Sequence, residues 1–261
     1  MSREITFIEG IREAIDESMQ QDEEVILFGL GVDDPKRIFG STDNLIEKYG
    51  ESRVFDVPTS ENAITGIGIG AAINGKKPVM VHQRLDFFLL AMDQLVNAAA
   101  KWYFMFGSKS SVPITIRLIM GRGWGQGPTH SQNLQAWFAH IPGLKVVMPA
   151  TAIDAKGLML SSIKDKNPVI FMEHRWLHNI KGNVPQTLDP IEIGKANVIR
   201  KGDDITIVAM SYMVIEAIHA AEFLQSEGIS CEIIDLRTVA PIDYETVFES
   251  INKTKKTIIK R

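Results

Sequence analysis

Short apolar runs alternate with segments of helical periodicity along the first two thirds of the chain. Thr6 and Glu9 form a Thr-x-x-Glu capping box, and apolar residues then recur at helical spacing to about Met19, which predicts the first helix. The runs between helices are rich in β-branched residues, as strands covered on both faces require. The expected strands are residues 25–28, 54–57, 78–82, 112–118, 144–148 and 169–172, and the further expected helices are residues 45–49, 60–74, 86–104 and 153–164.

This alternation predicts an α/β fold with a mostly parallel sheet and helices on both faces. Such sheets bind ligands beyond the carboxyl ends of their strands. Glu61, Phe87 and His130 each follow an expected strand directly or nearly so. We therefore expect these three residues to converge on one site.

A second α/β unit is expected after a polar stretch without periodicity. Residues 178–194 contain two prolines and are interpreted as a linker, which divides the chain into domains at 1–177 and 195–261. The expected elements of the second unit are strands at 205–210, 231–236 and 257–259 and helices at 212–227 and 244–252. Three short strands make a thin sheet, and the last one ends at Arg261 with nothing to return over it. This domain is therefore interpreted as incomplete.

Residues 56–75, DVPTSENAITGIGIGAAING, place one carboxylate at the head of an apolar helix. The helix is expected to begin at Ser60 or Glu61, where a hydroxyl side chain caps free backbone N–H groups. No charge follows Glu61 until Lys76, so the helix is expected to be buried nearly all round. Burial favours the protonated form of a carboxyl group, which suits proton transfer, whereas the helix N-terminus favours the anion. The alternative is a first-turn carboxylate that serves only the helix dipole.

Two groups of alternating glycines invite further interpretations. Gly66, Gly68 and Gly70 imitate a dinucleotide fingerprint, but they lie inside the expected helix instead of between a strand and a helix, so we interpret them as close helix packing. The stretch GRGWGQGPTHSQ carries glycines at positions 121, 123, 125 and 127 and ends near His130. Such an unrestricted backbone predicts a mobile loop that closes over or clears a site.

Composition excludes several classes of function. A net charge of −4 and a pI near 5.9 give no basic surface for nucleic acid or an anionic membrane. No apolar run approaches the roughly 20 residues that span a bilayer, and the first residues lack the regions of a signal peptide, so a cytoplasmic location is expected. The single cysteine, Cys231, excludes an internal disulfide and a cysteine-based metal cluster.

Several motifs, in the same order along nearly the whole chain, resemble one protein family. They are PTSENAITGIGIGAAINGKKPV, DQLVNAAAKW, HSQNLQAWFAHIPGLKVVMP, DAKGLMLSSIKDKNPVIFME and DLRTVAPIDYETVFESI. The chain resembles the beta subunit of the thiamine-diphosphate-dependent 2-oxo acid dehydrogenases of pyruvate and branched-chain type. The resemblance implies a transketolase-like pyrimidine-binding domain followed by a transketolase C-terminal domain, in agreement with the two expected α/β units.

The resemblance implies roles for four residues. Glu61, in the PxSE motif, would hydrogen-bond the aminopyrimidine ring and favour the imino tautomer that removes a proton from the thiazolium carbon. Phe87 falls where an aromatic ring lies against the aminopyrimidine, and Gln83 where a neighbouring contact is made. His130, in the THSQ motif, matches a histidine that handles the 2-oxo acid or its covalent adduct. From the residues alone, Phe87 also admits simple core packing and His130 a loop position without a role.

The resemblance further implies a potassium site of backbone carbonyls and one carboxylate, for which oxygen ligands are suited. From the residues alone, an Asp–Asn turn at a helix end explains the same stretch equally well. The residues concerned are Ile114, Ser162, Ile163, Asp165 and Asn167.

Three departures from the family pattern stand out. Leu30 occupies the cofactor-contacting position where the family usually has a glutamate, so one polar partner of the cofactor is missing. Arg84 replaces an uncharged residue beside the site and suits recognition of a carboxylate or phosphate on an unusual substrate. The family's C-terminal domain also continues beyond Arg261, so the chain is expected to be truncated.

No stretch matches the GDG…N motif that anchors the cofactor diphosphate through magnesium. The resemblance therefore implies a half-site that an alpha subunit completes in an α2β2 assembly, with thiamine diphosphate and magnesium between unlike chains, a 2-oxo acid as substrate and a lipoyl acyltransferase core as a further partner. One rival is a split transketolase-like or carboligating enzyme, motivated by Leu30 and Arg84. A second rival is a non-catalytic assembly partner, against which Glu61 argues. A nicotinamide-binding protein is a distant third because of the misplaced glycines.

Overall fold

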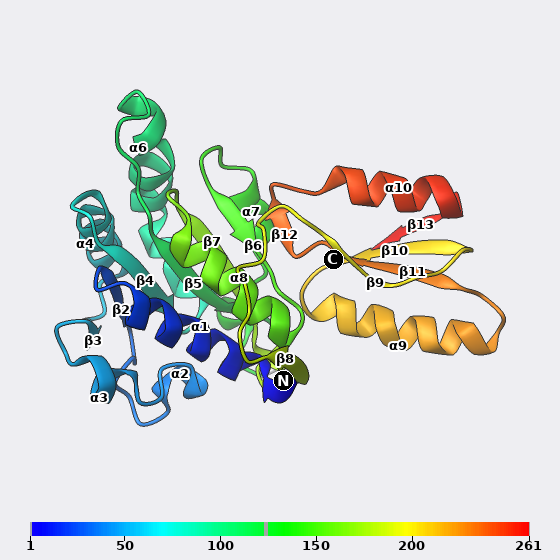
Figure 1. Cartoon of the computed structure of the whole chain (residues 1–261). Helices are drawn as coiled ribbons and strands as arrows, with labels where there is room; N and C mark the ends of the chain where they lie inside the picture. Colours follow the sequence, from blue (N-terminus) through cyan, green and yellow to red (C-terminus); the bar gives the residue numbers. More distant parts are fainter. Residues whose placement is uncertain (1, 123–124, 261) are drawn as a thin grey trace.

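The computed structural model describes residues 2–122 and 125–260 and contains two α/β units (Figure 1). The larger unit is built on a seven-stranded sheet in the order β12-β6-β7-β5-β4-β2-β3. Its strands pair in parallel except for β12, which is antiparallel to β6. The strands are β2 (Val25–Gly29), β3 (Val54–Asp56), β4 (Lys77–His82), β5 (Thr115–Met120), β6 (Lys145–Val147), β7 (Val169–His174) and β12 (Thr238–Ala240). The mostly parallel α/β architecture expected from the sequence is confirmed.

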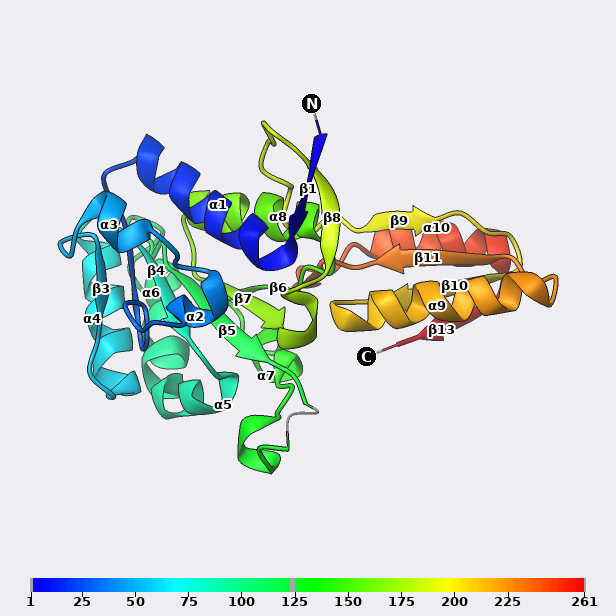
Figure 2. The same ribbon diagram turned by 90° about the horizontal axis from the view of Figure 1, so that it is seen from below.

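Helices α1 (Phe7–Gln21) and α8 (Ala152–Lys164) cover one face of this sheet (Figure 2). The predicted capping box begins α1: the Thr6 hydroxyl accepts from the Glu9 N–H at 3.3 Å, and the Glu9 carboxylate accepts from the Thr6 N–H at 2.7 Å. Thr151 caps α8 in the same way through the Asp154 N–H. Both helices therefore begin where local hydrogen bonding favours it.

The opposite face carries α4 (Glu61–Ile73), α5 (Leu85–Phe88), α6 (Ala100–Met105) and α7 (Gln135–Ala139). Strand side chains alternate between the two layers, as the two-residue period of a strand requires: Val79 and Val81 join the α1 side, whereas Met80 joins the α4 side. Two apolar layers thus fix the sheet between them.

Two predictions about these helices are wrong in detail. The segment expected as one helix at 86–104 is helical throughout but passes from α5 through a 3-10 turn, η1 (Leu89–Ala91), and a π-helical stretch, η2 (Gln94–Ala99), before α6. The 3-10 turn has fewer than 3.6 residues per turn and the π-helical stretch has more, so the buried positions do not recur at α-helical spacing. As a result, Leu90 is 66% exposed while Phe88 is fully buried. The helix α4 covers the sheet with one face only, since Ile67 is 68% exposed, and the Ser60 side chain makes no capping hydrogen bond.

A two-stranded antiparallel sheet joins β1 (Ser2–Thr6) to β8 (Lys181–Pro185) (Figure 2). The strand β8 lies within the segment interpreted as a linker, which is therefore not structureless. Its partner is far away in sequence, so the local pattern gave no sign of it. The predicted domain boundaries at 177 and 195 stay a prediction.

The smaller unit has four strands in the order β13-β10-β11-β9, of which only β9 runs antiparallel, to β11. The helices α9 and α10 cover opposite faces of this sheet (Figure 1). The fourth strand, β9, was not predicted. The elements are β9 (Asn197–Arg200), β10 (Ile205–Ala209), α9 (Tyr212–Ser226), β11 (Cys231–Asp235), α10 (Tyr244–Thr254) and β13 (Thr257–Ile259).

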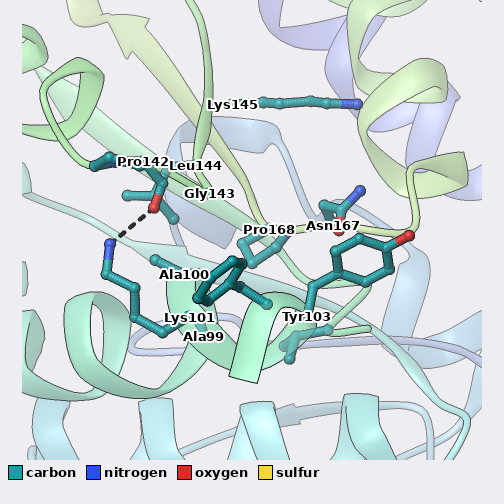
Figure 3. Close-up of a pocket in the computed structure, with 12 residues that line it drawn as sticks. Ala99, Ala100, Lys101, Tyr103, Pro142, Gly143, Leu144, Lys145, Asn167 and Pro168 are labelled. Carbon is teal, nitrogen blue, oxygen red and sulfur yellow. Dashed lines mark hydrogen bonds between the residues drawn. The ribbon is translucent and has the colours of Figure 1, made fainter. Parts of the chain in front are cut away.

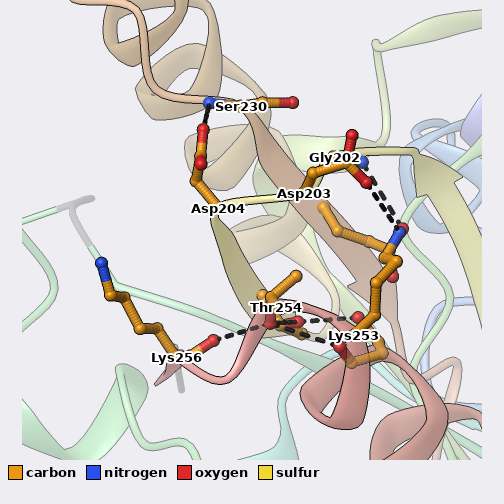
Figure 4. A network of polar contacts seen from close by, with 10 residues as sticks. Gly202, Asp203, Asp204, Ser230, Lys253, Thr254 and Lys256 are labelled. Atoms are coloured by element: carbon orange, nitrogen blue, oxygen red, sulfur yellow. Dashed lines mark hydrogen bonds and ion pairs between the residues drawn. The ribbon is translucent and has the colours of Figure 1, made fainter.

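A polar network fixes α10 to the strands of the smaller unit (Figure 4). The buried Glu232 carboxylate pairs with Lys253 and accepts from the Gly202 N–H at 3.4 Å. Burial would raise the pKa of Glu232, but the hydrogen bonds from Lys253, from Ser250 and from the Gly202 N–H hold it below its usual value. The Thr206 hydroxyl lies 2.7 Å from the Thr254 hydroxyl. These bonds fix the position of α10 on the sheet of the smaller unit.

A buried ion pair crosses the central strands β5 and β7. Arg117 and Glu173 are both fully buried, and the Arg117 Nε and Nη2 atoms donate to Glu173 Oε1 at 3.1 and 2.8 Å. His178 Nε2 lies 3.4 Å from the other carboxylate oxygen, and the Ser41 hydroxyl accepts from Arg117 Nη1. Burial would raise the pKa of Glu173, but the Arg117 charge and the contact to His178 hold it below its usual value.

Short elements complete the fold. In the described part of the chain, no helix is both long enough and apolar enough to cross a bilayer. The predicted helix at 45–49 is confirmed. The remaining elements are α2 (Arg37–Gly40), α3 (Leu45–Tyr49), η3 (Pro128–His130) and η4 (Arg175–Leu177).

Candidate functional site

A cavity of about 630 Å³ opens where β3, β2 and β4 end side by side. All four residues predicted to contact the cofactor line it, namely Leu30, Glu61, Gln83 and Phe87. Parallel strands bring their carboxyl ends to one edge of the sheet, which is why residues 57 positions apart in sequence meet here. The remaining lining residues, not predicted from the sequence, are Gly31, Asp33, Asp34, Pro35, Asp56 and Thr59.

Glu61 contributes a carboxylate to a largely apolar helix face. It occupies the first turn of α4, directly after the loop that follows β3, and its side chain is only 6% exposed. The N-terminus of α4 favours negative charge at this position. The structure therefore combines the two features expected from the sequence, burial and a helix N-terminus, in one group at the cavity wall.

Gly31 and Asp56 fix the conformation of the loop after β2, which lies close to Gln83. Asp56 accepts from the Gly31 N–H at 2.6 Å and from the Val32 N–H at 3.4 Å, which fixes the loop after β2. Gly31 has φ +79°, and a Cβ atom there would lie 2.0 Å from Gln83 Nε2. The positive φ favours glycine, and a side chain at position 31 would displace the end of the Gln83 side chain, so Gly31 and Asp56 support the cavity. A Gly residue after the first strand was the only sequence signal for this role.

His130 reaches the same site through Phe87. The two rings meet edge to face, with centroids 5.4 Å apart and an interplanar angle of 89°. His130 Nδ1 shares a hydrogen bond of 3.2 Å with the Thr129 hydroxyl. Asp86 accepts from the Gln132 backbone N–H and side-chain amide, at 3.3 and 2.8 Å, and so anchors the segment beyond His130. Glu61 and Phe87 line the cavity as expected, whereas His130 contacts Phe87 and does not itself line the cavity.

The glycine-rich loop between β5 and η3 includes positions 123 and 124, which lie outside the described residues, and the prediction for Gly123 therefore lies outside them as well. Gly125 and Gly127 have φ values of +67° and +78°, a conformation that favours glycine. The loop motion expected from the glycine pattern stays a prediction.

None of the residues predicted to bind potassium lines this cavity, and one of them, Asn167, lines a largely apolar cavity of about 600 Å³ together with Lys145 (Figure 3). Asp165 forms an ion pair with Lys145 and accepts from the Asn167 N–H at 2.9 Å. A protein ammonium group therefore already neutralises the one carboxylate of the set. Potassium binding here stays a proposal. The other members, Ile114, Ser162 and Ile163, are buried.

Two family models match the two α/β units. Residues 3–180 match the model described as "Transketolase, pyrimidine binding domain", and residues 194–260 match "Transketolase, C-terminal domain". A solved structure titled "Split gene transketolase, inactive beta4 tetramer" superposes with a TM-score of 0.78 at 23% identity, covering 98% of this chain and 78% of that one. The two family models and the fold thus define a transketolase-type protein.

Curated relatives narrow the class. The beta subunit of the pyruvate dehydrogenase E1 component of Rickettsia conorii is 41% identical, with 98% of this chain and 78% of the relative covered. The 2-oxoisovalerate dehydrogenase beta subunit of Bacillus subtilis is 41% identical with the same coverage. The beta subunit of acetoin:2,6-dichlorophenolindophenol oxidoreductase of Cupriavidus necator is 42% identical, with 99% and 79% covered. The chain belongs to the family of beta subunits of the thiamine-diphosphate-dependent 2-oxo acid dehydrogenases.

Proposed function

We propose that this chain supplies the half of a thiamine diphosphate site that activates the cofactor for oxidative decarboxylation of a 2-oxo acid. The observation that carries the proposal is the buried Glu61 carboxylate at the wall of a cavity shared with Gln83 and Phe87. When bound, thiamine diphosphate supplies an acidic carbon that adds to a carbonyl group and stabilises negative charge there.

The residues of the cavity fit the aminopyrimidine part of this cofactor. Glu61 would accept a hydrogen bond from the ring and exchange a proton with it, as a carboxylate held in an apolar setting can do. Phe87 offers an aromatic face, and Gln83 offers an amide that both donates and accepts. Leu30 adds an apolar contact where a second carboxylate would be expected.

His130 would serve the substrate side of the same site. Its ring contacts Phe87, and a histidine side chain can act as a proton donor or acceptor in catalysis. Phe87 would therefore lie between the cofactor ring in the cavity and the His130 ring.

The same proposal includes the partners. An alpha subunit in an α2β2 assembly would hold the diphosphate and magnesium, because no stretch of this sequence matches the GDG…N motif that anchors them in the family. A lipoyl acyltransferase core would accept the product, and the cytoplasm would be the compartment. Potassium at Asp165 belongs to this proposal as well.

Reconstitution tests the proposed reaction. The chain is co-expressed with the alpha-type chain encoded nearest to it, and decarboxylation is measured with a panel of 2-oxo acids, an artificial electron acceptor and lipoamide. We expect turnover of at least one 2-oxo acid that depends on both chains. Consumption of ketose donors with aldose acceptors, without oxidative turnover of any 2-oxo acid, would contradict the proposal and support a carboligating enzyme. The Leu30 and Arg84 departures favour that second candidate.

A further inference from the structure

Asp86 connects the two sides of the candidate site. It precedes Phe87 in α5, and Phe87 lines the predicted cofactor cavity. Its carboxylate oxygen Oδ1 accepts from the Gln132 backbone N–H at 3.3 Å and from Gln132 Nε2 at 2.8 Å. Gln132 stands two residues after His130, whose ring meets the Phe87 ring edge to face at 5.4 Å. The helix α5 thus contributes one ring to the cavity and one carboxylate to the segment that carries His130.

The turn around His130 closes on itself. The Gly127 carbonyl accepts from the His130 N–H at 3.3 Å and from the Ser131 hydroxyl at 3.0 Å. The Thr129 hydroxyl lies 3.2 Å from His130 Nδ1. These three bonds determine the shape of the turn, but they do not connect it to the rest of the protein. The position of the turn relative to the cavity therefore depends on contacts with other segments.

Two polar contacts, one on each side of His130, supply that connection. After His130, Gln132 donates to Asp86, and before it the Gln126 side-chain oxygen accepts from Arg84. The Arg84 contact engages the exposed side chain of Gln126, whereas the Asp86 contact fixes the backbone as well. Burial lowers the pKa of Arg84, and the negative charge of Asp86 partly opposes this effect. Asp86 therefore acts on both contacts.

We propose that Asp86 is a positioning residue, which holds His130 against Phe87 and so keeps the substrate side of the site aligned with the cofactor side. The inference rests on the proposed function, in which Phe87 contacts the aminopyrimidine and His130 serves the 2-oxo acid or its adduct. Asp86 is not among the residues that line the cavity, so it acts through its neighbours. The stretch before His130 is rich in glycine, and holding it in place beforehand removes an entropic cost from the reaction.

Hydrogen exchange of the full chain, without cofactor or partner, tests the contact itself. The exchange of backbone amides is followed at single-residue resolution in the wild-type protein and in the Asp86→Ala and Asp86→Asn variants. We expect the Gln132 amide to exchange about tenfold faster in Asp86→Ala, because its acceptor is lost. Asp86→Asn keeps an acceptor oxygen, so its Gln132 amide should stay within about threefold of the wild-type rate. An unchanged Gln132 amide in Asp86→Ala would overturn the inference.

The control variant is Asp204→Ala, which removes the same kind of contact from the smaller unit. The Asp204 carboxylate accepts from the Ser230 N–H at 2.7 Å (Figure 4). This variant should leave the exchange of residues 126–132 unchanged. Faster exchange of these residues in both Ala variants would indicate a general loss of stability and would overturn the inference.

Kinetics of the reconstituted enzyme test the positioning role. We expect Asp86→Ala to lower kcat about tenfold while the Kd for thiamine diphosphate stays unchanged, and Asp86→Asn to retain most of the activity. In a His130→Ala background, the Asp86→Ala change should cost nothing further, because Asp86 acts through His130. A full additional loss in that background, or a loss of cofactor affinity in place of kcat, would overturn the inference. If the wild-type chains together turned over no 2-oxo acid, the proposed function would fail, whereas the exchange result would still support or overturn the role of Asp86 in holding His130.

Discussion

Replacing Glu61 by Gln is expected to lower the activity of the reconstituted enzyme by about 10²–10⁴-fold, the usual contribution of a positioned proton-transfer group. The amide keeps the size of the side chain and can still hydrogen-bond, but it cannot hold and return a proton. Since Glu61 is buried at the wall of the cofactor cavity, the loss should appear in kcat. The melting temperature and the stoichiometry of thiamine diphosphate binding should be retained.

The matched control is Glu245→Gln. Glu245 also stands in the first turn of a helix, α10, but its side chain is 77% exposed in the smaller unit. Wild-type activity is expected for this variant. If Glu61→Gln were as active as Glu245→Gln, Glu61 would be a helix-dipole residue only, and the chain would be an assembly partner without a catalytic role.

Replacing Arg117 by Met is expected to reduce the free energy of unfolding by about 3–5 kcal/mol, the usual effect of breaking a fully buried ion pair. The variant leaves the Glu173 carboxylate in the protein interior without its guanidinium partner, with His178 Nε2 at 3.4 Å. Urea denaturation followed by circular dichroism measures the change through the midpoint of unfolding. The effect on the site should be indirect, because Arg117 does not line the cavity around Glu61.

The double variant Arg117→Met, Glu173→Leu separates the two causes of this loss. Removing both charges leaves no uncompensated ion, so most of the stability should return. A double variant as unstable as the single one would show that side-chain packing, and not the unpaired carboxylate, determines the loss.

The sequence was most informative where structure depends on neighbours along the chain. The capping box of Thr6 and Glu9 marked the start of α1 because its two hydrogen bonds span only three residues. Glu61 and Phe87 were expected together because parallel strands end at one edge, whereas Leu30 and Gln83 came from the family resemblance, and all four line the cavity. Their roles toward the cofactor stay predictions.

Structural features that depend on residues far apart in the sequence could not be predicted from the pattern of hydrophobic and polar positions. The strands β1 and β8 pair across about 180 residues of chain, and β9 and β12 are short edge strands with no alternation of their own. The exposed Leu90 follows from a change of helix type, which a fixed 3.6-residue period does not describe. Asp56 and Gly31 act through backbone geometry that becomes visible only in the folded loop.

Calorimetric titration of thiamine diphosphate with magnesium is the most direct test of the half-site. It is performed on this chain alone and on its mixture with the alpha-type chain encoded nearest to it. We expect tight binding only in the mixture, because the cavity around Glu61 offers contacts to the aminopyrimidine and the partner is proposed to hold the diphosphate. Equally strong binding to the isolated chain would contradict the account, since the diphosphate anchor would then lie within this chain.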